Sequence, residues 1–261
     1  PMSLAAVPIG VQDSGANLVG GAERMLSFGG NPEVTLAPGE TVFSDPLEFA
    51  VQPFQKLGIS FSTSLTALSL PRHARATEIA YLSVAGAPFL PLAIEQYASW
   101  YVIEGLEVQG GPARQTVVAL GDSITDGFNA VIGVPGTGDP RSFGKDGRYP
   151  DFLQKRLLAA GRNDLSVANA GISGNRVIAD GLTPDFGPAL GTRLQADVLD
   201  LPNVRTVILL EGINDLTLQI PLNPQAIIDG LDAVVKRLQA AGIRVVLGTI
   251  TPSRGAYAAI L

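Results

Sequence analysis

Apolar and polar positions divide the chain into two patterns that meet near residue 113. In the first part, short β-branched and aromatic runs stand between clusters of Gly, Pro, Asn and Asp, and no segment keeps a helical period. These runs predict strands over 3–11, 33–36, 41–51, 56–64, 78–86 and 99–108. Short strands separated by turns favour an all-β, sandwich-like or jelly-roll-like domain over residues 1–113.

From residue 116 onward, strand-like and helix-like segments alternate. Apolar runs at 116–120, 165–170, 204–212 and 243–250 predict strands, and the segments 149–161, 187–201 and 224–242 predict helices. The last helix should turn one apolar stripe to the core, made of Ile227, Ile228, Leu231, Val234, Val235 and Leu238. The alternation predicts an α/β domain with a parallel sheet over residues 114–261.

Both ends of the sequence suggest that each domain is incomplete. The chain starts at Pro1, which is not how translation begins. The last predicted strand is apolar along its length, as is typical of a strand covered on both faces, yet no helix follows it. We therefore expect residues to be missing before the first domain and after the second.

Composition excludes several classes of function. A net charge of −6 does not fit a nucleic-acid-binding protein. No apolar run approaches the roughly 18 residues of a membrane span. With one histidine and no cysteine, neither a transition-metal site nor a disulfide framework is expected. The low charge and the many Gly and Pro residues favour a secreted or periplasmic protein, and nothing in the composition indicates an oligomeric state.

Polar residues gather where the predicted strands of the second domain end. Asp122 and Ser123 follow the first strand, 169–176 follow the second and 211–216 follow the third. Ligands of open parallel sheets bind at the carboxyl ends of the strands. The connections 124–147 and 171–186 are longer than most loops in α/β domains, which is typical of functional segments. A candidate site is therefore expected at this edge.

Three short blocks at these strand ends resemble the signatures of the SGNH (GDSL-type) ester hydrolases. They read "GDSITDG", "NAGISGNR" and "GIND", and they occur in the order of that family. The resemblance covers residues 116–261, and the first domain is similar to the N-terminal modules of some two-domain bacterial members. It implies a flavodoxin-like three-layer α/β/α domain that hydrolyses carboxylic esters without a cofactor.

The resemblance also implies roles for three residues. Ser123 would attack the ester carbonyl and carry the acyl group, and the developing oxyanion would be held by the N–H of Ser123, the N–H of Gly174 and the side-chain amide of Asn214. Fixed donors of this kind contribute about 3 to 4 kcal/mol each to transition-state stabilisation. The substrate would be a small-molecule or carbohydrate ester, with an acetyl or another short acyl group.

Five neighbouring residues are candidates for supporting roles. Asp122 and Asp215 are expected to brace their loops by binding backbone amides. Asp126, Asn175 and Arg176 are expected to line the substrate cleft, with solvated turn positions as the alternative.

A general base is missing from this pattern. A serine hydroxyl needs an imidazole to accept its proton and an acid to orient that imidazole. The family supplies both from an Asp-x-x-His block, which this sequence lacks, and the only histidine is His73 in the first domain. We expect the base and its acid partner beyond residue 261. Recruitment of His73 and loss of catalysis, leaving a non-catalytic carbohydrate- or surface-binding protein, are the alternatives.

Overall fold

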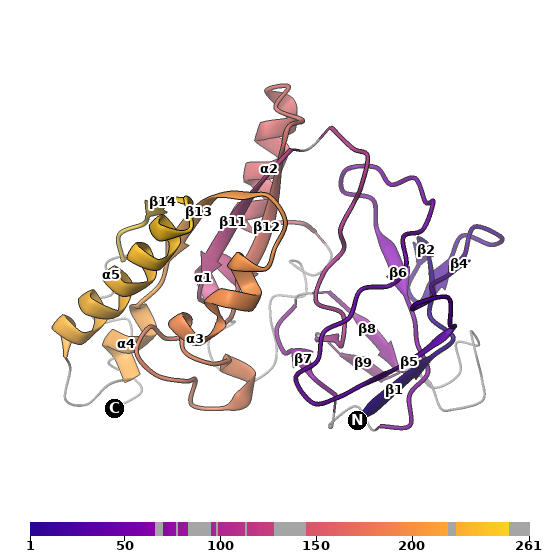
Figure 1. The fold of residues 1–261 in the computed structure, drawn as a ribbon, viewed down its shortest axis with the longest axis horizontal. Helices are drawn as coiled ribbons and strands as arrows, with labels where there is room; N and C mark the ends of the chain where they lie inside the picture. Colours follow the sequence, from indigo (N-terminus) through magenta and orange to yellow (C-terminus); the bar gives the residue numbers. More distant parts are fainter. Residues whose placement is uncertain are drawn as a thin grey trace. The chain divides into compact units, whose positions relative to one another are not determined.

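The computed structural model describes residues 1–65, 70–76, 78–82, 95–97, 99–112, 114–127, 145–218 and 223–250 (Figure 1). The chain forms two compact units. The β-rich unit contains Pro1–Arg72 and Glu78–Val102, and the α/β unit contains His73–Thr77 and Ile103–Leu261. The short segment that begins at His73 therefore belongs to the α/β unit, although the residues on both sides of it in the sequence do not.

The β-rich unit is built from short antiparallel pairs. β1 pairs with β5, β2 pairs with β3, β4 and β6, and β8 pairs with β9. Leu4, Val7 and Leu36 form its buried cluster. The strands are β1 (Met2–Ala5), β2 (Pro8–Ser14), β3 (Asn17–Leu18), β4 (Arg24–Met25), β5 (Glu33–Leu36), β6 (Leu57–Ile59), β7 (Arg72–His73), β8 (Ala80–Leu82), β9 (Glu95–Tyr97) and β10 (Trp100–Tyr101).

Several of the predicted strands are shorter, divided or absent in the structure. The segment 99–108 forms a strand only at Trp100–Tyr101, because the next residue, Val102, has a φ of 67°. The segment 3–11 is divided between β1 and β2, because Ala6 has a φ of 50° that no strand accommodates. The segment 41–51 forms no strand. Pro46 has no N–H to donate to a ladder, and the neighbouring Asp45 instead accepts the hydroxyl of Ser27 at 2.6 Å. At these places a positive φ angle or a proline prevents a continuous strand, and the pattern of apolar and polar residues does not reveal either feature.

The α/β unit contains a parallel sheet in the order β12-β11-β13-β14. Its strands are β11 (Gln115–Gly121), β12 (Leu165–Gly171), β13 (Val204–Leu210) and β14 (Arg244–Leu247). The first strand along the chain lies inside the sheet, so the connections leave it toward both sides. This is the topological switch point at which open α/β sheets bind ligands, and β11 leads there into Asp122 and Ser123.

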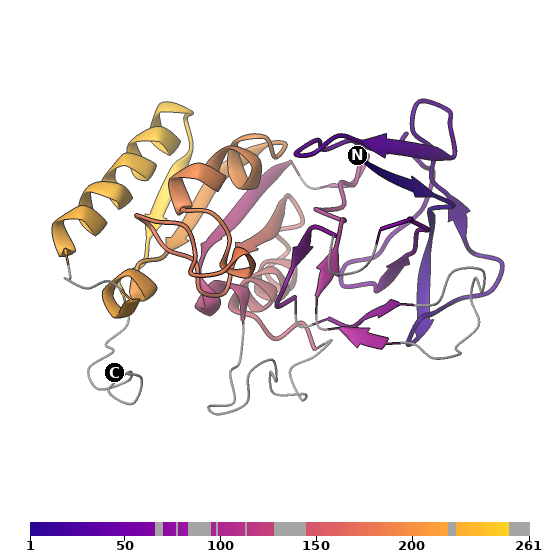
Figure 2. The same cartoon turned by 90° about the horizontal axis from the view of Figure 1, so that it is seen from below.

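Helices cover the sheet. The buried core joins Val118, Leu120, Val207 and Leu209 of the strands to side chains of α3 and α5. In both views α5 runs alongside β14 (Figures 1 and 2). The helices and turns are α1 (Ser123–Asp126), α2 (Tyr149–Ala159), η2 (Pro184–Phe186), α3 (Leu190–Leu194), the π-helical turn η3 (Gln195–Leu199), α4 (Ile213–Leu218) and α5 (Pro224–Ala240).

The helix predicted over 187–201 is thus a short α-helix continued by a π-turn. In α5, Ile227, Val234 and Leu238 are buried as expected, but Ile228 is 57% exposed. One residue along a helix is a rotation of about 100°, which carries Ile228 past the margin of the stripe. Among the described residues, no helix combines the length and the apolar character needed to cross a membrane.

Candidate active site

The end of β11 turns sharply into α1. Gly121 permits the turn, because a Cβ there would lie 2.3 Å from the carbonyl oxygen of Leu210 and 2.2 Å from Oγ1 of Thr125. Asp122 caps α1 by accepting the N–H of Ile124 at 2.9 Å. Ser123 is the first residue of the helix and is half-buried. The nucleophile candidate therefore lies at a helix N-terminus, braced by the preceding carboxylate.

The second block forms a tight turn beside this helix. The N–H of Ile172 donates to the carbonyl of Gly121 at 2.9 Å, and the N–H of Asn175 donates back to the carbonyl of Ile172 at 3.0 Å. Gly174 has a φ of +83°, and a Cβ there would lie 2.6 Å from the ring of Phe186. Both the conformation and the close aromatic ring restrict this position to glycine.

Each of the three predicted oxyanion donors has an N–H bond without an acceptor among the described residues. Within the described part of the chain, the N–H groups of Ser123 and Gly174 have no acceptor. The side-chain amide of Asn214 donates to the carbonyl of Asn175 at 2.9 Å. Since that amide carries two N–H bonds, one remains for a ligand. Asn214 thus lies against the residue that follows Gly174.

A buried carboxylate joins the first two blocks. Asp126, 2% exposed, accepts the N–H of Ser173 at 3.0 Å and its hydroxyl at 2.5 Å. The other oxygen of Asp126 lies 2.8 Å from Nε2 of His73. Asp126 was expected to line a substrate cleft, but its carboxylate is occupied by these internal contacts. His73 is correspondingly held at Asp126, and no hydrogen bond joins it to Ser123 among the described residues.

The remaining candidates are also bound within the loops. Asp215 is fully buried and accepts the N–H groups of Val177 and Ile178 at 2.9 and 3.1 Å, so that it braces the second block from the third. Asn175 is fully buried, and its side-chain amide donates to the carbonyls of Phe186 and Pro188. Arg176, half-buried, donates to the carbonyl of Asp180 in its own loop.

Sequence reasoning missed two charged residues beneath the site, Arg193 and Glu211. Arg193, 4% exposed, comes from α3 and donates to three backbone or side-chain oxygens around the strand ends. Glu211, 2% exposed, directly follows β13. The available signal was a charged residue inside an apolar segment, since Arg193 interrupts an apolar helix and Glu211 ends an apolar strand.

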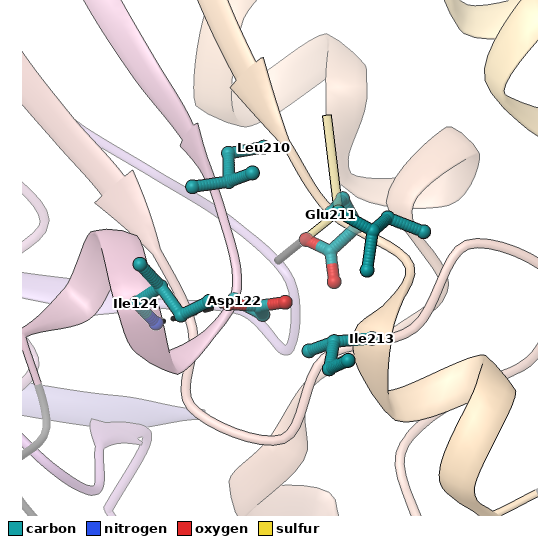
Figure 3. Close-up of a pocket in the computed structure, with 6 residues that line it drawn as sticks. Asp122, Ile124, Leu210, Glu211 and Ile213 are labelled. Carbon is teal, nitrogen blue, oxygen red and sulfur yellow. Dashed lines mark hydrogen bonds between the residues drawn. The ribbon is translucent and has the colours of Figure 1, made fainter. Parts of the chain in front are cut away.

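Glu211 and Asp122 face the same small niche, which Leu210, Ile124, Ile213 and Ile250 also line (Figure 3). Among the described residues, neither oxygen of Glu211 has a hydrogen-bond partner, although one lies 3.6 Å from Nη2 of Arg193. Burial, followed by the proximity of Asp122, raises the pKa of Glu211 well above its usual range. Burial also raises the pKa of Asp122 to about 6. The described residues hold no cluster of three or more His, Asp or Glu arranged to bind a metal ion.

Comparison with solved structures gives matches that cover only part of each chain. A mutant of esterase AlinE4 is 24% identical over 54% of this chain and 62% of its own, with a TM-score of 0.39. An aryl esterase from M. smegmatis is 21% identical over 51% and 62%, with a TM-score of 0.43. An acetyl xylan esterase, AlAXEase, is 26% identical over 51% and 56%, with a TM-score of 0.36. This chain therefore spans about three fifths of the length of these structures.

No curated protein matches the chain. The model of the GDSL-like lipase/acylhydrolase family matches residues 119–260, which is more than half of the sequence. The match contains the three signature blocks together with the strand ends that carry them. The chain belongs to the GDSL-like lipase/acylhydrolase family.

Proposed function

We propose that this protein is a serine-dependent carboxylic ester hydrolase. The observation that carries the proposal is a set of N–H groups at the strand ends that have no acceptor among the described residues, namely those of Ser123 and Gly174, together with the second N–H of the Asn214 amide. Family membership supports acyl chemistry. The strand order 2-1-3-4 supports a flavodoxin-like three-layer domain, and the short paired strands support a sandwich-like accessory unit.

The reaction follows from these groups. The hydroxyl oxygen of Ser123 attacks the ester carbonyl while a base takes its proton, and the carbonyl oxygen becomes an oxyanion. The amide donors stabilise this charge more than they stabilise the neutral ester, which lowers the barrier. Collapse expels the alcohol and leaves the acyl group on Ser123, and water releases the acid by the same steps. Small acetyl or short-chain esters, including those of carbohydrates, are the proposed substrates.

We propose that an imidazole and a carboxylate from outside these 261 residues act as the base and its orienting acid. The position of His73 supports this assignment. Its Nε2 atom lies 2.8 Å from Asp126, which also accepts the N–H and the hydroxyl of Ser173. His73 and Asp126 are thereby engaged in holding the second block, and neither is hydrogen-bonded to Ser123 in the described structure.

The test is hydrolysis of p-nitrophenyl acetate by the full-length protein. Wild-type protein should turn the ester over, and Ser123→Ala should lower kcat by on the order of 10³-fold or more, since the nucleophile is removed. Ser3→Ala, which changes an exposed serine of the β-rich unit, is the matched control and should keep wild-type kcat. Turnover that survives Ser123→Ala would refute the proposed nucleophile. Ester binding without any turnover would favour the non-catalytic binding protein.

A further inference from the structure

Arg193 is a buried cation with three hydrogen bonds to the strand ends and the turn that form the candidate site. Its side chain is 3% exposed. Nε donates to Oδ1 of Asn175 at 2.8 Å, Nη2 donates to the carbonyl of Gly121 at 2.9 Å and Nη1 donates to the carbonyl of Ala170 at 2.8 Å. Nη1 also binds Asp197 at 2.6 Å. One planar group therefore contacts the ends of both β11 and β12 and the turn after β12.

Two of these partners, Gly121 and Asn175, lie within two residues of a proposed oxyanion donor. Gly121 precedes Asp122 and Ser123, so its carbonyl fixes the start of α1. Asn175 follows Gly174, and its backbone carbonyl is the acceptor for Asn214. The side chain of Asn175, held by Arg193, in turn donates to the carbonyls of Phe186 and Pro188. The contacts of Arg193 thus lead to all three donors.

This arrangement requires the shape of arginine. The guanidinium directs rigid N–H bonds from Nε, Nη1 and Nη2 to separate acceptors, whereas a lysine ammonium is a compact charge on a flexible stem. Burying a cation is unfavourable unless its donors are satisfied, and carbonyls of two strands, an amide oxygen and a carboxylate satisfy them here. The fork consequently fixes the distance between the first two blocks.

We propose that Arg193 is a positioning residue that sets the geometry of the oxyanion donors. The inference rests on the proposed ester hydrolysis and deepens it. Arg193 does not contact the substrate, and it acts by holding Gly174 and Asn214, through Asn175, at fixed places relative to Ser123. Such preorganisation matters for the charged transition state and little for binding of the neutral ester. Its loss should therefore lower kcat and leave KM nearly unchanged.

The experiment compares Arg193→Lys in the wild-type background and in the Asn214→Ala background of the full-length protein, with p-nitrophenyl acetate as substrate. We expect kcat to fall about 10²-fold in the wild-type background, comparable to removal of one oxyanion donor. In the Asn214→Ala background the further loss should be smaller, about 10-fold, because the part of the effect that acts through Asn214 is already absent. A purely structural role would give equal losses in both backgrounds.

Arg237→Lys is the matched control. Arg237 is exposed and donates to the carbonyl of Gly191 and to Gln195, so it contacts the same segment as Arg193 from outside. This variant should keep wild-type kcat and KM. Hydrogen exchange of the amides at 172–177 should accelerate in Arg193→Lys and stay unchanged in Arg237→Lys.

Asp197→Asn provides a second variant if Arg193→Lys does not fold. It removes one anchor of the guanidinium at a side chain that is 28% exposed, and it should lower kcat about 3-fold in the wild-type background and less in the Asn214→Ala background. Unchanged kcat, or equal losses in both backgrounds, would refute the positioning role while an inactive Ser123→Ala still upholds the nucleophile. Activity in Ser123→Ala would instead overturn the proposed function, and the positioning role with it.

Discussion

Two aspartates, one in each unit, accept hydrogen bonds from similar groups but differ in burial. Asp45 of the β-rich unit accepts the hydroxyl of Ser27 and the N–H groups of Gly29 and Gly30. Asp126 of the α/β unit accepts the hydroxyl and the N–H of Ser173 and faces His73. Asp45 is partly exposed, whereas Asp126 is 2% exposed. A serine, neighbouring loop amides and one carboxylate occur in both places.

Burial separates the two roles. The hydroxyl of Ser27, with the amides of Gly30 and Gly29, lowers the pKa of Asp45, which shows a stabilised carboxylate at the protein surface. Water can replace any of these partners. Asp126 is 2% exposed, so the loss of a partner leaves a buried polar group unsatisfied. The hydrogen bonds of Asp45 close a surface loop. Those of Asp126 hold Ser173, the residue that precedes Gly174.

Replacement of each aspartate by asparagine should have the largest effect and tests this difference. Asp126→Asn places an N–H₂ group or a neutral oxygen against Ser173 and His73, and we expect the free energy of unfolding to fall by about 2 to 4 kcal/mol. Asp45→Asn should change it much less, since solvent reaches that site. Urea denaturation of both variants measures the effect. Equal losses would show that burial does not distinguish the two motifs.

A pair of glycines sharpens the same comparison at a smaller scale. Gly174 and Gly30 have φ angles of +83° and +80°, but a Cβ at Gly174 would meet the ring of Phe186 at 2.6 Å, whereas nothing lies within 4 Å at Gly30. Alanine should cost about 1 to 2 kcal/mol at Gly30 from backbone strain alone. Gly174→Ala should cost roughly 1 kcal/mol more and also displace a proposed oxyanion donor.

Thermal denaturation checks the first of these effects, and kcat with p-nitrophenyl acetate checks the second. Gly30→Ala serves as the control for strain and should keep wild-type kcat. If both variants lose the same stability, the aromatic contact at Gly174 contributes nothing to the restriction.

Glu211→Gln should have the smallest effect at about pH 4.5. It contrasts a buried carboxyl that has no side-chain hydrogen bond among the described residues with the hydrogen-bonded Asp126. Because its folded pKa is raised above the usual 4.5, folded protein holds a proton that unfolded protein releases as the pH rises. Wild-type stability should therefore decrease above about pH 4.5, by at most about 1.4 kcal/mol per pH unit from this group. Glutamine, which cannot ionise, should remove that decrease.

The measurement is the difference in unfolding free energy between Glu211→Gln and wild type at pH 4 and at pH 7. The difference should become more favourable to the variant at the higher pH. A difference independent of pH would mean that Glu211 ionises equally easily in the folded and unfolded chains.

Much of the α/β unit could be predicted from the sequence. The central strands β11 and β13 are apolar and contribute buried core residues, and helix α5 has a regular stripe, so local pattern and tertiary packing agree there. The roles of Ser123, Gly174 and Asn214 follow from the resemblance of three strand-end blocks to a known family, and they stay predictions. The β-rich unit was less predictable, since its strands are short and their pairing depends on distant partners.

The support of the site was not predictable for a different reason. Asp126 and Asn175 carry polar side chains in loops, and such residues are usually exposed. In the fold, Asp126 contacts His73, which lies 53 residues earlier in the sequence. Asn175 contacts Arg193, which lies 18 residues later. One sequence contains no signal for such long-range polar pairs, because the energy of each pair depends on the burial that the whole fold produces.

The segment that starts at His73 determines how the protein can be dissected. His73 contacts Asp126, and the carbonyl of Ala76 accepts a hydrogen bond from the guanidinium of Arg148, all within the α/β unit. A single cut at residue 103 would consequently deprive the remaining piece of an imidazole and a carbonyl that it uses internally. Any replacement of the β-rich unit would therefore have to leave this short stretch with the α/β unit.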